Sequence, residues 1–143
     1  MPEGMERFGS HPARDVSIRS MTLVEAGDRE AWLGLWAEDG FIEDPIGPSM
    51  FDPEGKGWHG PEGIARFWDD VSSKQPVNLV VRESYACGNE CANVATITIT
   101  FPDGGTAIVE GVFTYRINDA GKLAALRAYW ETDAMRFEPA PSS

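Results

Sequence analysis

The 143 residues have the length of one ordinary domain, and a hydrophobic content of 42% is enough for a single core. Twelve Lys and Arg against twenty-three Asp and Glu give a formal net charge of −11, which opposes binding to nucleic acid or to anionic lipid surfaces. No apolar run approaches the roughly 20 residues of a membrane span, and the amino terminus has no hydrophobic signal region. We therefore expect a cytoplasmic protein that binds neither nucleic acid nor membrane.

The two ends of the chain are predicted to be mobile. Residues 1–12, rich in Gly, Pro and charge, are predicted to form a disordered tail, and residues 138–143 a frayed one. A single domain is expected over residues 13–137. Cys87 and Cys91 are too few for a disulfide framework or a four-ligand zinc site, so reduced thiols are expected, with no metal and no cofactor.

Apolar spacing predicts three helices in the first half of the chain. In the second helix Trp32, Leu35 and Trp36 have the i, i+3, i+4 spacing of a core-facing stripe. Pro61 suits the first position of the third. The predicted helices are residues 12–26, 28–40 and 61–71.

The second half has the composition of β-structure. Branched and aromatic residues are frequent between turns rich in Gly, Asn and Asp, and the turns are short enough for an antiparallel meander. The predicted strands are 77–85, 92–101, 106–117 and 123–133. Helices followed by such a sheet indicate the α+β class, with the sheet curving into a cone around an apolar pocket.

One carboxylate flanked by apolar residues stands where a short strand must stop, in Phe41-Ile42-Glu43-Asp44-Pro45-Ile46-Gly47. Strand side chains alternate, so Ile42 and Asp44 share a face, and Pro45 cannot continue a ladder. An Asp held there against apolar neighbours would have a raised pKa and could serve as a general base. A simple Asx turn before proline is the alternative.

Several short motifs occur in a fixed order along the chain: Ala26-Gly27-Asp28, Trp36-Ala37-Glu38-Asp39, the Asp44 stretch, Gly60-Pro61-Glu62-Gly63-Ile64, Asn118-Asp119-Ala120-Gly121-Lys122 and Leu126-Arg127-Ala128. On these motifs the chain, from about Val16 to Phe137, resembles a ketosteroid isomerase of the nuclear transport factor-like superfamily. Two segments look closest to an actinobacterial steroid-isomerase-like subgroup: Gly111-Val112-Phe113-Thr114-Tyr115-Arg116 and Arg127-Ala128-Tyr129-Trp130. The resemblance implies three amino-terminal helices packed on a strongly curved antiparallel sheet.

The resemblance also implies that Asp44 moves a proton within a β,γ-unsaturated ketosteroid or a similar apolar ketone. In such isomerases a tyrosine and a protonated Asp hold the dienolate oxygen. The matching positions here are Ser20 and Phe113, or Gly111 if the alignment slips by two residues in the Asn118–Gly121 turn, so the usual donors are replaced. Possible substitutes carry hydroxyl or indole groups: Tyr115, Tyr129, Trp58, Trp68 and Trp130. The expected substrate-binding residues are Ser20, Trp36, Ile42, Trp58, Trp68, Gly111, Phe113, Tyr129 and Trp130.

Two other functions remain open at this stage. The same cone could hold a steroid-like ligand without turnover. Epoxide hydrolase or polyketide cyclase chemistry would need an arginine flanked by acids, which Arg127 or Arg116 with Asp44 and Glu110 could supply, although strand alternation predicts that Glu110 faces away from the pocket.

A homodimer is expected as well. Members of the superfamily commonly pair through the convex face of the sheet, and the strands here carry branched residues on both faces, including Val94, Thr96, Ile97 and Ile99.

Overall fold

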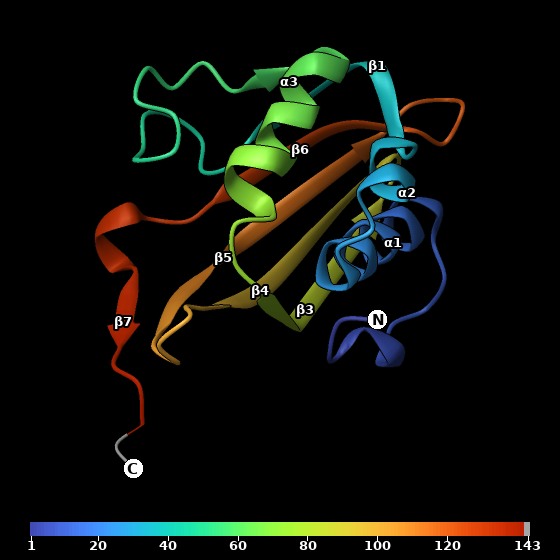
Figure 1. Ribbon diagram of the computed structural model, residues 1–143. Helices are drawn as coiled ribbons and strands as arrows, with labels where there is room; N and C mark the ends of the chain where they lie inside the picture. The colour runs from blue at the N-terminus through green and yellow to red at the C-terminus, as the bar shows by residue number, and fades with distance from the viewer. Residues whose placement is uncertain (142–143) are drawn as a thin grey trace.

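The computed structural model describes residues 1–141, in which three α-helices lie on one face of an open seven-stranded sheet (Figure 1). The helices are α1 (Pro12–Ala26), α2 (Arg29–Leu33) and α3 (Gly60–Phe67). The strands are β1 (Trp36–Glu43), β2 (Trp58–His59), β3 (Val77–Cys87), β4 (Glu90–Thr100), β5 (Thr106–Ile117), β6 (Leu123–Tyr129) and β7 (Arg136–Glu138).

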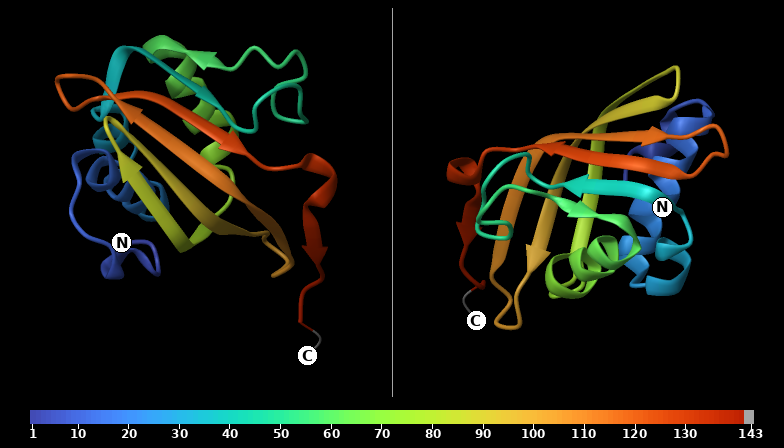
Figure 2. Two further views of the ribbon diagram at one scale, coloured as in Figure 1. Left: turned by 180° about the vertical axis from the view of Figure 1, so that it is seen from behind. Right: turned by 90° about the horizontal axis from the view of Figure 1, so that it is seen from above.

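The sheet has the strand order β2-β1-β6-β5-β4-β3, and β7 pairs with the first part of β5. Strands β3 to β6 form the predicted antiparallel meander. The α+β prediction is confirmed, but the sheet is mixed rather than wholly antiparallel, because β1 runs parallel to β6. From above, the sheet curves over the helices (Figure 2).

The second predicted helix is much shorter than expected. It ends at Leu33, and Trp36 already belongs to β1, where it pairs with Leu123. The amide of Leu123 donates to the carbonyl of Leu35 at 2.8 Å. Pairing with a strand that lies far along the chain therefore outweighs the helical spacing of the tryptophans, which carries no information about that partner.

The third predicted helix changes its winding before it ends. Residues Trp68–Ser72 form a π-helix, and the amide of Ser73 donates to the carbonyl of Trp68 at 2.9 Å. This segment leads into β3 along one edge of the sheet.

Aromatic side chains pack between the helices and the inner face of the sheet. Trp32 is 1% exposed and lies 5.5, 6.4 and 5.1 Å from the ring centroids of Trp36, Phe67 and Trp68. Such contacts add to the free energy of burial and fix the distance between helices and sheet.

The amino-terminal segment is packed, which corrects the prediction of a disordered tail over residues 1–12. Its backbone joins β3 through Glu3, whose amide donates to Leu79 and whose carbonyl accepts from Val81, at 3.1 and 2.8 Å. Met5 is 1% exposed within the core. A Cβ on Gly4 would lie 2.1 Å from the carbonyl oxygen of Val81, so only glycine permits this approach.

The carboxy-terminal strand also differs from the prediction. Strand β6 ends at Tyr129, short of residue 133, and the chain then turns before β7 pairs with β5. Of the predicted frayed tail, residues 142–143 lie outside the described part of the chain.

Candidate functional site

A cavity of about 400 Å³ lies between the helices and the inner face of the sheet. Most of its lining is apolar and comes from α1, α3 and four strands; it includes Met21, Phe67, Leu79, Ile97, Val109, Phe113 and Leu126. This volume and polarity are typical of small-molecule sites.

Strand alternation turns the Asp44 side chain toward this cavity. Ile42 is fully buried in the core, whereas Glu43 points outward and accepts from Arg127 Nε at 2.7 Å. The Asp44–Pro45 peptide bond is cis, and the amide of Ile46 then donates to the carbonyl of Ala128 at 3.1 Å. The chain is thus held to β6 on both sides of Asp44, and the carboxylate lines the cavity.

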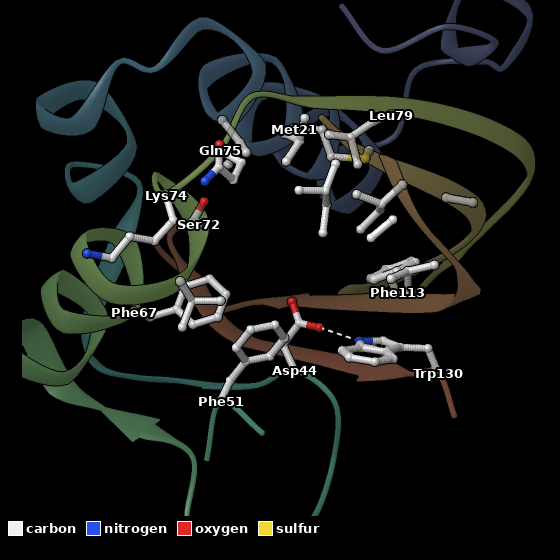
Figure 3. A pocket seen from close by; sticks show the side chains of 18 of the residues that line it. Met21, Asp44, Phe51, Phe67, Ser72, Lys74, Gln75, Leu79, Phe113 and Trp130 are labelled. Atoms are coloured by element: carbon white, nitrogen blue, oxygen red, sulfur yellow. Dashed lines mark hydrogen bonds between the residues drawn. The ribbon is translucent and has the colours of Figure 1, made fainter. Parts of the chain in front are cut away.

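The Asp44 carboxylate has one oxygen bound and one facing the cavity. Trp130 Nε1 donates to Oδ1 at 2.7 Å, and the other oxygen points into the open space (Figure 3). Burial raises the pKa of Asp44 from 3.8 to about 6, and the Trp130 hydrogen bond acts in the opposite direction. A carboxylate with such a pKa can both take up and release a proton near neutral pH.

Trp130 reaches Asp44 because the chain leaves β6 opposite a glycine. A Cβ on Gly111 would lie 2.3 Å from the Tyr129 carbonyl oxygen and 2.8 Å from Trp130 Cβ. The indole also makes an edge contact with Phe51, at 6.4 Å between ring centroids. Gly111 therefore leaves room for the residue that holds Asp44.

Two buried hydroxyl groups line the same cavity. Ser20 of α1 accepts a hydrogen bond from Trp32 Nε1 at 3.1 Å. Tyr115 of β5 is 5% exposed, and its pKa is raised by burial and, to a lesser extent, by the negative charge of Asp44.

Polar side chains also gather at the far end of the cavity. Ser72 and Gln75 lie away from Asp44, and their hydroxyl and amide groups face the open space (Figure 3). Asp70 and Lys74 belong to the same segment between α3 and β3. The cavity is therefore polar at both ends and apolar between them.

Of the ten residues expected from the sequence, Ser20, Asp44, Phe113 and Trp130 line the cavity. The other six lie outside its lining: Trp36, Ile42, Trp58, Trp68, Gly111 and Tyr129. Four of these pack in or beside the core, Gly111 acts as the spacer described above, and Tyr129 is 50% exposed.

Sequence reasoning missed part of the lining. The loop 45–60 was expected to form part of the rim, but its residues Met50 and Phe51 were not singled out, because no local periodicity marks them. Tyr115 was named only as a possible donor, yet it lies two residues after Phe113 on the same strand and so on the same face. That alternation was a usable signal.

The charged residues considered for epoxide or cyclase chemistry lie elsewhere. Arg116 and Arg127 line a separate polar hollow on the outer face of the sheet, together with Glu43 and Glu90. Glu110 contacts Arg82 and Arg136 and does not line the cavity, in agreement with the alternation argument. No arginine stands among the described cavity residues.

Within residues 1–141 no three His, Cys, Asp or Glu side chains are close enough to hold a metal ion together. Over the same range, no helix combines the length and the apolar character that crossing a bilayer requires.

Comparison with known proteins agrees with the fold. The family profile described as SnoaL-like domain matches residues 18–126, and the chain belongs to this family, within the nuclear transport factor-like superfamily. Three solved structures are each 38% identical to the chain with a TM-score of 0.84, and each alignment covers 90% of the chain.

The first of these is RV0760c from Mycobacterium tuberculosis in complex with estradiol-17beta-hemisuccinate, covered over 100% of its length. The second is Delta 5-3-ketosteroid isomerase from Mycobacterium sp., covered over 99%. The third is a computationally designed 17-OHP binder, covered over 98%.

Proposed function

We propose that the protein is a steroid Δ-isomerase-like enzyme in which Asp44 is the general base. The observation that carries this proposal is a carboxylate with one oxygen held by Trp130 and the other directed into an apolar cavity. Burying a carboxylate costs free energy, so a carboxylate that is kept in an apolar cavity is expected to have a function there.

The substrate is a β,γ-unsaturated ketosteroid or a similar apolar ketone. Asp44 takes the proton from the carbon between the carbonyl and the double bond. The electron pair of that C–H bond forms a new double bond to the carbonyl carbon, and the π pair of the carbonyl group moves to its oxygen, which gives a dienolate. The same carboxyl group then returns the proton to the γ-carbon, which leaves the conjugated ketone and regenerates the carboxylate. The similarity to a ketosteroid isomerase supports this class of substrate.

The test is the growth of conjugated-enone absorbance with wild type and Asp44→Asn. The substitution keeps the shape but removes the basic lone pair, so the rate should fall by about 10² or more. Asp39→Asn is the matched control, because Asp39 is an exposed acid on β1, the strand that ends just before Asp44, and lies outside the cavity lining. An Asp44→Asn variant as fast as wild type would refute the proposal.

A second candidate is a binding protein without turnover. One related structure in complex with a steroid ester and a designed relative that binds 17-OHP favour it. If neither wild type nor Asp44→Asn isomerises a ketosteroid while both bind steroid with equal affinity, this candidate is the better one.

The proposed enzyme is a homodimer that pairs through the outer face of its sheet. Of the branched residues named for the two faces of the strands, Val94 and Thr96 do not line the cavity, whereas Ile97 and Ile99 do. Sedimentation at micromolar concentration should give the mass of two chains, and a monomer at that concentration would count against the dimer.

A further inference from the structure

Proton abstraction next to a ketone places negative charge on the carbonyl oxygen, and that charge requires hydrogen-bond donors aimed at it. The positions at which the resemblance places such donors hold Ser20 and Phe113. A phenyl ring donates no hydrogen bond, and the question is which other groups of the cavity do.

Ser20 has a hydroxyl hydrogen free for the cavity. Its oxygen accepts from Trp32 Nε1 at 3.1 Å, and among the described residues no acceptor receives its hydrogen. The other hydroxyls of α1 differ, because Ser17 donates to the Arg14 carbonyl at 2.8 Å and Thr22 to the Ile18 carbonyl at 2.7 Å. A hydroxyl that accepts a hydrogen bond becomes a stronger donor, so the Trp32 contact favours donation by Ser20.

Tyr115 supplies a second hydroxyl from the opposite wall. It is cross-strand neighbour to Leu126 and Cys91 on the inner face of the sheet, and it lines the cavity. Within residues 1–141 its hydroxyl group has no hydrogen-bond partner. Burial and the charge of Asp44 both raise the pKa of Tyr115, so the phenol keeps its proton wherever Asp44 is ionised.

We propose that Ser20 and Tyr115 are the donors that hold the oxygen of the ligand on which Asp44 acts. This rests on the proposed function for the reaction itself. The ligand class is a ketone, or a phenol that imitates its enolate. Both donors keep their protons throughout. They donate hydrogen bonds to the developing oxyanion while Asp44 carries the transferred proton. When that proton returns to carbon, the carbonyl group re-forms and the negative charge on the oxygen is lost.

The kinetic test uses Tyr115→Phe and Ser20→Ala, each of which removes one hydroxyl and little volume. Loss of one oxyanion donor should lower kcat by about 10²–10³ for Tyr115, and by less for the weaker serine donor. The matched controls are Tyr85→Phe, whose ring is 61% exposed, and Thr22→Val, whose hydroxyl bonds to its own helix. Both controls should isomerise at the wild-type rate.

The binding test separates hydrogen bonding from packing and needs no turnover. Asp44→Asn, which imitates the neutral base of the intermediate, is titrated with 2-naphthol and with naphthalene, with and without each hydroxyl substitution. Tyr115→Phe should weaken the binding of 2-naphthol about tenfold and the binding of naphthalene by less than about twofold, because only 2-naphthol has an oxygen that can accept a hydrogen bond. Equal losses for both ligands would mean that Tyr115 acts by packing, and would overturn the proposal.

The two arms distinguish the two proposals. If Asp44→Asn abolishes turnover while Tyr115→Phe and Ser20→Ala isomerise like wild type, the donor assignment fails and the proposed function stands. If wild type shows no turnover but the hydroxyl substitutions weaken the binding of 2-naphthol and not that of naphthalene, the donor assignment is correct and the protein is a binding module. Thermal unfolding of each variant establishes that it is folded.

Discussion

At the scale of single residues, the titration of Asp44 has two opposing causes. Burial raises its pKa to about 6, and the hydrogen bond from Trp130 limits that rise. Ordinary aspartates are fully ionised well below neutral pH, so this carboxyl group gains and loses its proton in a range where an enzyme assay can follow it.

Trp130→Phe should move the pH profile upward. The variant keeps a ring against Phe51 but loses the N–H that stabilises the carboxylate, so the pKa of Asp44 should rise further above its wild-type value of about 6. The isomerisation rate, which increases with pH as Asp44 ionises, should then reach half its maximum at higher pH. Trp36→Phe is the control, because within residues 1–141 the buried Nε1 of Trp36 has no hydrogen-bond partner. An unchanged midpoint in Trp130→Phe would contradict the assigned role.

Asp44→Asn should also stabilise the fold, by an amount that grows as pH rises from 3.8 to about 6 and is complete above that range. The folded pKa of about 6 exceeds the ordinary value of 3.8, so the folded state binds the proton more tightly and loses stability as pH rises between those values. The asparagine variant escapes this loss, which amounts to at most about 3 kcal/mol. Urea unfolding should find the variant more stable than wild type at pH 8 and equal to it at pH 4. A difference independent of pH would mean that Asp44 is not the group responsible.

At the scale of elements, the site is shaped by segments that lie far apart in the sequence but meet in the folded chain. The first residues of the chain lie against β3, and the turn after β6 brings Trp130 to Asp44. Neither contact involves a helix or strand that the other needs, so the two can be tested separately.

Met5→Ala should destabilise the protein by about 2–4 kcal/mol, because it removes a buried side chain and leaves a cavity beneath β3. Met1→Ala, at a residue that is 61% exposed, is the control and should have little effect. Free energies of unfolding from urea titration give the comparison. Equal, small effects of both substitutions would mean that the amino-terminal segment is a mobile tail, as the sequence predicted.

Gly111→Ala should disturb the Trp130 contact. The added methyl group would overlap the Tyr129 carbonyl and Trp130 Cβ, so we expect a loss of about 1–3 kcal/mol in stability and a lower isomerisation rate. Gly9→Ala has open space around its Cβ and serves as the control. Wild-type activity in Gly111→Ala would show that Trp130 does not depend on this glycine.

At the scale of the whole molecule, the cavity interrupts the core between the helices and the sheet. A ligand that fills it adds contacts to both layers and binds only the folded state. Saturation to about 100 times Kd stabilises a protein by about 2.7 kcal/mol. For a chain of this length we expect estradiol to raise Tm by about 5–10 °C.

Ala95→Phe provides the sharper form of this experiment. Ala95 lines the cavity, so a phenyl ring there should occupy the ligand's space and abolish the rise in Tm. Val94→Phe places the same ring on the opposite face of β4 and should leave the rise intact. If both variants respond to estradiol like wild type, the ligand does not bind in this cavity.

Local patterns in the sequence were sufficient for much of the fold. The first helix was predicted with its observed bounds, Pro12–Ala26, because helical spacing and a following glycine suffice to define it. The strands of the meander were likewise predictable from alternation and short turns. The inward direction of Asp44 followed from its distance of two residues from Ile42 and from the proline that ends the strand.

The tertiary structure alone decided the short second helix, the packed amino terminus and the surroundings of Asp44. Each depends on a contact between residues far apart in sequence: Leu35 with Leu123, Glu3 with Val81, and Asp44 with Trp130. Periodicity within one segment reports which face is apolar but not which distant segment will cover it. For that reason the sequence was enough to predict the acid, whereas only the folded chain brought the Trp130 indole to it and placed the hydroxyl groups of Ser20 and Tyr115 in the same cavity.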